Sequence, residues 1–189
     1  MNALTFEETN LLCIYNPGTR QGAMSSFLPD VLTRIGEALG LSAQARRQAL
    51  AGSLLLSADN GHAVHPNFPE KADPANKVYP NGGVVIKYSA NQKYTTTGLT
   101  AGLFQAICQK AGVPVQVFAN RADEPGGSTL GNLLGHQVSI PMVDIAMAQL
   151  AMHSAVETAG SRDPEYMARA CAAFFQAEFT QTADGVYQF

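Results

Sequence analysis

The stretch LLLSADNGHAVHPN, residues 54–67, says more about the fold of this chain than any other part of the sequence. Its leucines have the length and hydrophobicity of a buried strand, and Asp59, His62 and His65 follow within a short loop. A strand that ends in a carboxylate and two imidazoles is typical of a site at the carboxyl edge of an α/β sheet. The alternative is a polar loop whose histidines hydrogen-bond to its own backbone.

Strand-like and helix-like patterns alternate on both sides of this stretch. Apolar or β-branched runs predict strands at residues 11–15, 84–88, 115–118, 138–140 and 143–145. Apolar spacings and capping residues predict helices over 26–39, 43–50 and 98–111, and further helices that start near His153 and at Asp163-Pro164. Residues 66–82 predict a long surface loop. The alternation favours one α/β domain over residues 1–189, built around a largely buried sheet.

The composition narrows the class of protein. The chain has 189 residues, of which 46% are hydrophobic and 14% charged, so it is long and apolar enough to bury a core. Its apolar runs are too short to cross a bilayer, which predicts no membrane partner. A net charge of −3, with no basic cluster beyond Arg46-Arg47, speaks against nucleic acid. Three widely spaced cysteines suit a reducing cytoplasm. Since few residues are charged, we expect apolar surface that a homo-oligomer would cover.

Several stretches resemble the aspartyl aminopeptidase family of zinc metallopeptidases, in the family's order and spacing and over most of residues 19–160. They are TRQGAMSSFLPDVLTRI from Thr19, SADNGHAVHPN from Ser57, GGVVIKYSANQKYTT from Gly82, FANRADEPGGSTLG from Phe118 and VDIAMAQLAMHSAVETAG from Val143. The resemblance implies a three-layer α/β/α sandwich with a mixed sheet, of the zinc-exopeptidase type. It also implies a zinc-dependent aminopeptidase that releases N-terminal Asp or Glu from peptides.

Two residues match the family's zinc ligands. They are Asp59 in SADNGHAVHPN and His153 in QLAMHS. Neutral imidazole and carboxylate are common zinc ligands. Each residue also has a structural interpretation, because an aspartate at a strand end can cap a loop and a histidine after a strand can be a satisfied structural group. The fold must bring the two together if they share a metal.

His62 and Lys87 match positions that contact substrate in the family. His62 could donate a hydrogen bond to a developing oxyanion. Lys87 could pair with an acidic side chain of the substrate, which suits N-terminal Asp or Glu, although a lone lysine at a strand end is usually a solvated charge. His65 is interpreted as orienting its loop, and Asp144 as structural or as a support for His153.

The loop of residues 123–129, DEPGGST, resembles the family's active-site glycine loop. Its N–H groups could face a substrate or simply form a tight turn. It lacks the Lys-Ser/Thr ending of a phosphate loop, so a phosphate-binding role is excluded.

The sequence also departs from the family pattern. The family's adjacent glutamates, one of them the general base, follow the strand that corresponds to residues 11–15, but NPGTRQGA stands here and no glutamate occurs between Leu11 and Gln21. The pair Glu7-Glu8 precedes that strand and is interpreted as a surface pair. Further ligands that lie upstream in the family have no counterpart, and Ala146 and Ala148 replace glycine and proline.

No catalytic base can therefore be assigned, and the isolated chain is expected to be inactive. One hypothesis is a metalloaminopeptidase part that a separate polypeptide or another subunit completes. A second is a non-catalytic remnant that acts as a binding or assembly module. A third is a truncated product whose isolated fold differs from that of the family and which associates with itself.

Overall fold

The computed structural model describes residues 24–183 and 186–188 of the chain. In chain order its elements are α3 (Phe27–Ala38), α4 (Ala43–Ala51), β1 (Leu55–Ala58), β2 (Gly61–His62), the 3₁₀ helix η2 (Pro69–Lys71), β3 (Val84–Tyr88), α5 (Gly98–Lys110), β4 (Val115–Ala119), α6 (Leu130–Leu134), β5 (Met142–Ala146), β6 (Ala148–Leu150), β7 (Thr158–Ala159), α7 (Asp163–Gln176), β8 (Thr180–Ala183) and β9 (Val186–Gln188). The strand expected at 11–15 and the pair Glu7-Glu8 lie outside the described residues.

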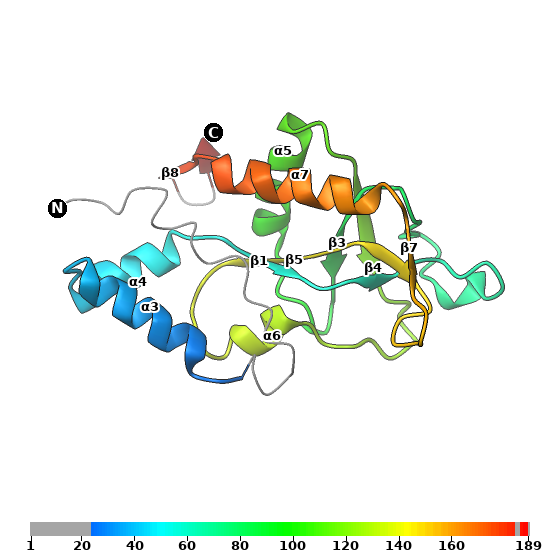
Figure 1. Cartoon of the computed structure of the whole chain (residues 1–189), viewed down its shortest axis with the longest axis horizontal. Coiled ribbons are helices and arrows are strands. Elements are labelled where there is room, and N and C mark those ends of the chain that lie inside the picture. Colours follow the sequence, from blue (N-terminus) through cyan, green and yellow to red (C-terminus); the bar gives the residue numbers. More distant parts are fainter. Residues whose placement is uncertain (1–23, 184–185, 189) are drawn as a thin grey trace.

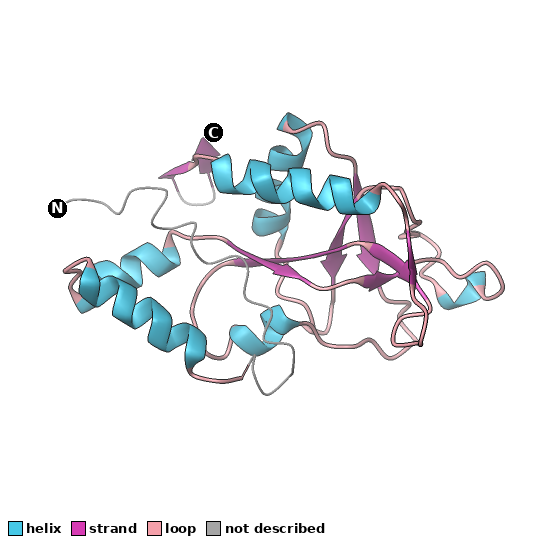
Figure 2. Ribbon diagram, in the orientation of Figure 1, coloured by secondary structure: helices cyan, strands magenta, loops and turns pink. Residues whose placement is uncertain are grey.

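Four strands form the central sheet, in the order β1-β5-β3-β4. Figure 2 shows the strands in magenta, with helices above and below them. β1 runs parallel to β5 and β3 parallel to β4. β3 and β5 pair antiparallel, with Val85 opposite Ala146 and Ile86 opposite Ile145. Continuing this register by one residue places Lys87 opposite Asp144. The predicted mixed sheet is confirmed.

A second, smaller sheet extends the β1–β5 pair. β2 pairs with β6 in parallel, and β6 pairs with β7 antiparallel. The chain stays hydrogen-bonded between the two parallel pairs, because the Asp59 N–H donates to Ile145 O and the Gly61 N–H donates to Met147 O, at 3.0 and 3.1 Å. Asp59 therefore lies at a short interruption in an otherwise continuous ladder.

Helices cover both faces of the central sheet, which produces three layers. Figure 1 shows α5 and α7 on one side of the sheet and α3, α4 and α6 on the other. The face under α5 and α7 carries the largest apolar core, in which Val84, Ile86, Val143 and Ile145 from the strands pack around Phe104 of α5. Because side chains alternate along a strand, every second residue of β3 and β5 belongs to this core. The predicted α/β/α sandwich is confirmed.

The opposite face of the sheet is divided into smaller apolar clusters. One forms around Leu55 and Leu134, and another around Val85 and Phe118. The same face also buries charged and polar side chains, Lys87 among them. The buried side chains that could bind a ligand therefore lie on this second face, because the buried side chains of the first face are apolar.

The predicted helix ends are confirmed where a capping side chain was recognised. Ser42 accepts a hydrogen bond from the Ala45 N–H at 3.1 Å and begins α4. Thr97 and Thr100 form a reciprocal capping box at the start of α5. Gly112, with a φ of +62°, follows the end of α5.

Two secondary-structure predictions are wrong. Residues 138–140 are not a strand: they lead into β5 without a strand partner, and Val138 and Ile140 are buried in the cluster around Leu134. No helix starts near His153, because β6 is followed by a turn and then by β7. Both errors arise because local apolar patterns do not reveal which segments find a hydrogen-bonding partner.

The start of α7 also differs from the prediction in one respect. Asp163 was expected to cap the helix, but Arg162 is the N-cap residue and Asp163 is the first helical residue. The Asp163 carboxylate instead accepts a hydrogen bond from the Asn81 N–H at 2.8 Å, and Asn81 Oδ1 accepts one from the Arg162 N–H at 2.8 Å. The aspartate therefore attaches α7 to the turn before β3. Among the described helices, none is long and apolar enough to cross a membrane.

Candidate metal and substrate site

The Lys87 side chain reaches from β3 to the loop after β1 that carries Asp59. Asp59 follows β1, is exposed, and contributes to the electrostatic environment of Lys87. Lys87, on β3, is only 3% exposed, so the interpretation as a solvated charge is wrong. Its ammonium donates a hydrogen bond to Asn60 O at 3.1 Å and lies 5.3 Å from the centroid of the Tyr94 ring. The fold thus buries a cation next to the loop that carries the predicted aspartate ligand.

Burial and the nearby carboxylates act in opposite directions on the pKa of Lys87. Removal from water lowers the pKa of the ammonium, whereas the negative charges of Asp59 and Asp144 oppose that shift. No carboxylate among the described residues makes an ion pair with Lys87 within 4 Å. Its ammonium instead contacts Asn60 O and the Tyr94 ring.

Asp144 does not support His153 directly, which had been one interpretation of the sequence. It is fully buried, and its Oδ2 accepts two hydrogen bonds from Thr95, one from the backbone N–H at 2.6 Å and one from the hydroxyl at 2.8 Å. Its own N–H donates to Thr96 Oγ1 at 2.9 Å. Its Oδ1 is buried without a hydrogen-bond partner among the described residues. Asp144 therefore anchors the segment before α5.

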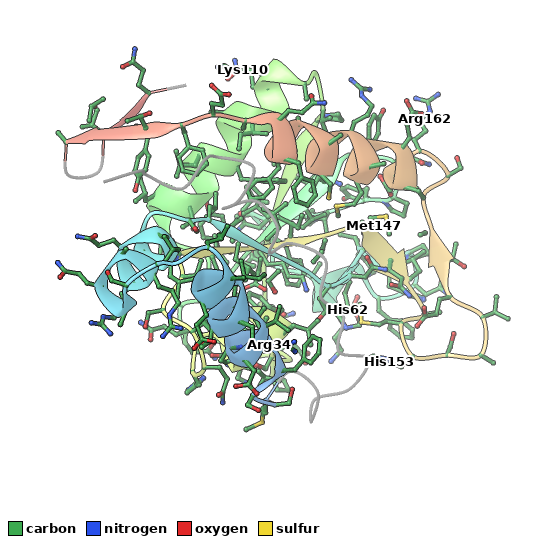
Figure 3. The ribbon with its side chains drawn as sticks, turned by 60° about the vertical axis from the view of Figure 1, so that its left-hand side comes forward. Arg34, His62, Lys110, Met147, His153 and Arg162 are labelled. Carbon is green, nitrogen blue, oxygen red and sulfur yellow. The ribbon has the colours of Figure 1, made fainter. Side chains whose placement is uncertain are left out.

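His62 lies on β2, beside His153. Partial burial is the main cause that lowers the pKa of the His62 imidazole, and the positive charges of His153 and Lys87 lower it further. Figure 3 shows both imidazoles at the same corner of the molecule. A neutral imidazole can donate one N–H while its other nitrogen accepts a hydrogen bond or binds a metal.

His153 occupies a strained turn after β6. Its φ is +67°, and that of Ala151 is +55°, so both residues adopt a left-handed conformation that costs about 1 kcal/mol or more for a residue other than glycine. The Glu157 carboxylate stabilises this turn by accepting a hydrogen bond from the His153 N–H at 2.6 Å. The imidazole is exposed. The turn therefore presents the histidine outward without burying it.

His65 orients its own loop, as predicted. Its Nδ1 accepts a hydrogen bond from the Asn67 N–H at 3.2 Å, and its ring packs on Phe68 with 5.2 Å between centroids.

Residues 120–127 overlap the predicted glycine loop of residues 123–129 and are called the glycine loop from here on. This segment is held from several directions before α6 begins. The Lys93 ammonium donates a hydrogen bond to Gly126 O at 2.6 Å, and Asn120 Nδ2 donates to the Tyr94 hydroxyl at 3.2 Å. An ion pair of 2.5 Å joins Lys71 to Glu124 on the outer side of the loop. Side chains from three other positions, Lys71, Lys93 and Tyr94, therefore hold the loop in place.

Electrostatic interactions link Lys87 to three of the predicted residues, Asp59, Asp144 and His62. Asp59 and Asp144 act on its charge, and it acts together with His153 on the pKa of His62. Within residues 24–183 and 186–188, no group of three or more His, Cys, Asp or Glu side chains is placed to hold a metal ion. The aspartate and the histidine are chemically suited to zinc, but they need further ligands.

The sequence profile of the family described as Aminopeptidase I zinc metalloprotease (M18) matches residues 17–175 of this chain. The chain belongs to this family. A probable M18 family aminopeptidase 2 of Clostridium acetobutylicum is 41% identical over 180 residues, which are 93% of this chain and 42% of that relative. The resemblance to the aspartyl aminopeptidases is thereby confirmed.

Solved M18 structures share the fold. A chain of the Ape4 and Nbr1 complex, determined by cryo-EM, superposes with a TM-score of 0.80 at 41% identity, over 84% of this chain and 30% of that one. The mApe1 dodecamer of S. cerevisiae superposes with a TM-score of 0.72 at 29% identity, over 84% of this chain and 34% of that one. This chain spans less than half the length of the M18 proteins that it matches.

Sequence reasoning missed three residues that shape the site. Tyr94 covers Lys87, Thr95 binds Asp144, and Glu157 holds the His153 turn. Tyr94 offered a usable signal, because it is a single aromatic residue within the polar segment NQKYTTTG. Thr95 and Glu157 offered none, because their partners lie on other elements or depend on an unusual backbone conformation.

Proposed function

We propose that this chain forms the substrate-recognising end of a zinc-dependent M18 aminopeptidase that releases Asp or Glu from the N-terminus of peptides. Asp59 and His153 would hold the metal, and a further segment or another polypeptide would supply the remaining ligands and the general base. The observation that carries the proposal is Lys87, a buried ammonium without an ion-pair partner within 4 Å among the described residues.

A buried charge is costly unless it is paired. The carboxylate of an N-terminal Asp or Glu side chain would supply the missing counter-charge to Lys87, whereas a neutral side chain would leave the ammonium unpaired. This difference favours acidic residues at the first position of the peptide. His62, with a pKa below its ordinary value, is neutral near pH 7 and can donate a hydrogen bond to the carbonyl oxygen of the bond to be cleaved.

Bound zinc would polarise that carbonyl group and lower the pKa of a coordinated water molecule. The residues of this chain then bind and orient the peptide, with Lys87 at its acidic side chain and His62 at its carbonyl oxygen. The glycine loop supplies N–H groups beside them. The family's glutamate pair has no counterpart between Leu11 and Gln21, so another segment or polypeptide would have to supply the general base.

We also propose that the complete protein is a cytoplasmic homo-oligomer. The matched S. cerevisiae mApe1 assembly is a dodecamer. Large apolar side chains are exposed on this chain as well, including Met24 and Phe27 before and within α3, at 52% and 54%.

The decisive experiment measures retained zinc and peptidase activity together. The chain is loaded with zinc and gel-filtered, alone and after mixing with the part of the C. acetobutylicum relative that this chain does not cover. We expect the mixture to retain zinc and to hydrolyse an aspartyl amide, and we expect Asp59→Ala and His153→Ala to lose both properties. A mixture that forms a stable complex yet neither retains zinc nor cleaves the amide would contradict the proposal.

A second candidate function is a non-catalytic binding module for acidic peptides. It is favoured by the observation that the described site contains two suitable metal ligands and no cluster of three. Binding of an aspartyl peptide by the chain alone, in the presence of a chelator and with loss of binding in Lys87→Met, would support this candidate. Strict dependence of binding on zinc would exclude it.

A further inference from the structure

The segment Lys93–Thr97 contacts a different part of the site with almost every residue. Lys93 bonds to the glycine loop and Tyr94 bonds to its first residue. Thr95 and Thr96 bond to Asp144 on β5, and Thr97 caps α5. A segment without regular secondary structure thus joins the loop, the sheet and a helix. Such a concentration of side-chain contacts in one irregular segment is a mark of positioning rather than of simple connection.

Tyr94 is the link between the glycine loop and the buried ammonium. It is 8% exposed, and its ring lies over Lys87 on one side and packs against Phe118 at 6.4 Å between centroids. Its hydroxyl accepts the hydrogen bond from Asn120, the first residue of the loop. Displacement of the loop would therefore move the ring that covers Lys87.

Lys93 holds the other end of the same loop. Its ammonium donates to the Gly126 carbonyl oxygen at 2.6 Å, a charge-assisted hydrogen bond. Gly126 packs so closely on the Asn120 side chain that a Cβ at this position would overlap with it. The two ends of the loop are thus in contact with each other, and adjacent residues of one segment bond to both.

We propose that Lys93 and Tyr94 are positioning residues that fix the glycine loop relative to Lys87, so that the loop N–H groups and the buried ammonium face the same ligand. The part of this inference that concerns the ligand rests on the proposed function, whereas the part that concerns the loop does not. The role of Lys93 rests on its hydrogen bond to the loop, and that of Tyr94 on its hydrogen bond to the loop and on its ring over Lys87.

The first measurement is amide hydrogen exchange of residues 120–127 in the whole chain. Lys93→Met removes the ammonium and keeps the stem, and we expect exchange in the loop to become about tenfold faster. Lys93→Arg retains a cationic donor and is expected to restore protection. Tyr94→Phe keeps the ring and removes the acceptor, and faster exchange is expected near Asn120. Lys77→Met, at an exposed lysine outside these contacts, is the matched control for the loss of one charge.

Unchanged loop exchange in both Lys93→Met and Tyr94→Phe would overturn the proposal, as would equal acceleration in Lys77→Met. An acceleration in Lys93→Arg as large as that in Lys93→Met would overturn the role of the charged hydrogen bond. The exchange experiment needs no ligand and no metal, so its outcome does not depend on whether the proposed function is correct.

The second measurement is calorimetric binding of aspartyl-alanine, with asparaginyl-alanine as the neutral comparison, to the chain completed as above. We expect the affinity for aspartyl-alanine to fall about tenfold in Lys93→Met and to return in Lys93→Arg. A faster-exchanging loop with unchanged affinity would overturn the claim that loop and ammonium face one ligand. Absence of aspartyl-alanine binding to the wild-type chain would refute acidic recognition by Lys87, and the exchange results would still decide the positioning of the loop.

Discussion

The two faces of the central sheet use equally buried positions for opposite purposes. Val143 and Asp144 are neighbours on β5, and both are fully buried. Ile86 and Lys87 are neighbours on β3, and both are buried as well, with only slight exposure of the lysine. The first residue of each pair packs under α5 and α7 in an all-apolar core, whereas the second faces the site. The apolar face of the strands therefore stabilises the fold. The other face buries charged side chains, which lowers stability unless their charges and hydrogen bonds are satisfied.

The largest effect is expected on the apolar face. Phe104 is fully buried at the centre of that core, and Phe104→Ala should lower the free energy of unfolding by about 3–5 kcal/mol, because the substitution leaves a cavity. Urea unfolding followed by circular dichroism measures the loss. A loss below about 1 kcal/mol would show that the face under α5 and α7 is not the main source of stability.

Asp144→Ala tests the polar face at a site of equal burial. It removes the acceptor of two hydrogen bonds from Thr95 and should lower the free energy of unfolding by about 2–4 kcal/mol, since a buried backbone donor loses its partner. Asp144→Asn keeps an acceptor oxygen and should cost less than half as much. If the asparagine variant unfolds as easily as the alanine variant, the charge and not the hydrogen bonds would be the important property.

A smaller effect of opposite sign is expected where the polar face ends. Ala151 has a φ of +55° in the turn that presents His153, and glycine adopts this conformation without steric cost. Ala151→Gly should therefore raise the free energy of unfolding by up to about 1 kcal/mol. Thermal unfolding measures the gain, with Ala155→Gly, in the same turn but without a positive φ, as the control. Equal responses of the two variants would contradict local strain at Ala151.

The smallest effect concerns pH. The pKa of His62 is lowered in the folded chain, so the unfolded chain binds more protons near pH 6 and stability rises with pH in that range. The contribution of His62 to stability is present above its ordinary pKa of 6.5 and is lost as the pH falls through the lowered value of the folded state. Urea titrations from pH 5 to pH 8 should show a shallower slope in His62→Asn. An unchanged slope would assign the pH dependence to other groups.

Much of the fold was accessible from the sequence because its signals are local. The run of β-branched residues at 84–88 predicted β3 with its observed bounds, and Ser42 and Thr97 predicted the starts of α4 and α5 through the chemistry of their side chains. The failures share one cause. Residues 138–140 have the composition of a strand but no strand partner, and the segment around His153 contains helix-forming residues but is held as a turn by Glu157.

The candidate site shows the same division. Motifs in the sequence picked out Asp59, His62, Lys87 and His153 one at a time, as residues that resemble those of a known family. Sequence by itself determined the residue types, the family and the helix caps, because these depend on side-chain chemistry and on neighbours within a few positions. Only the tertiary structure decided that Lys87 is buried rather than solvated, that Asp144 anchors Thr95 rather than His153, and that Lys93 and Tyr94 hold the glycine loop. Burial and hydrogen-bond partners depend on which distant strands lie side by side, and that is a property of the packed sheet.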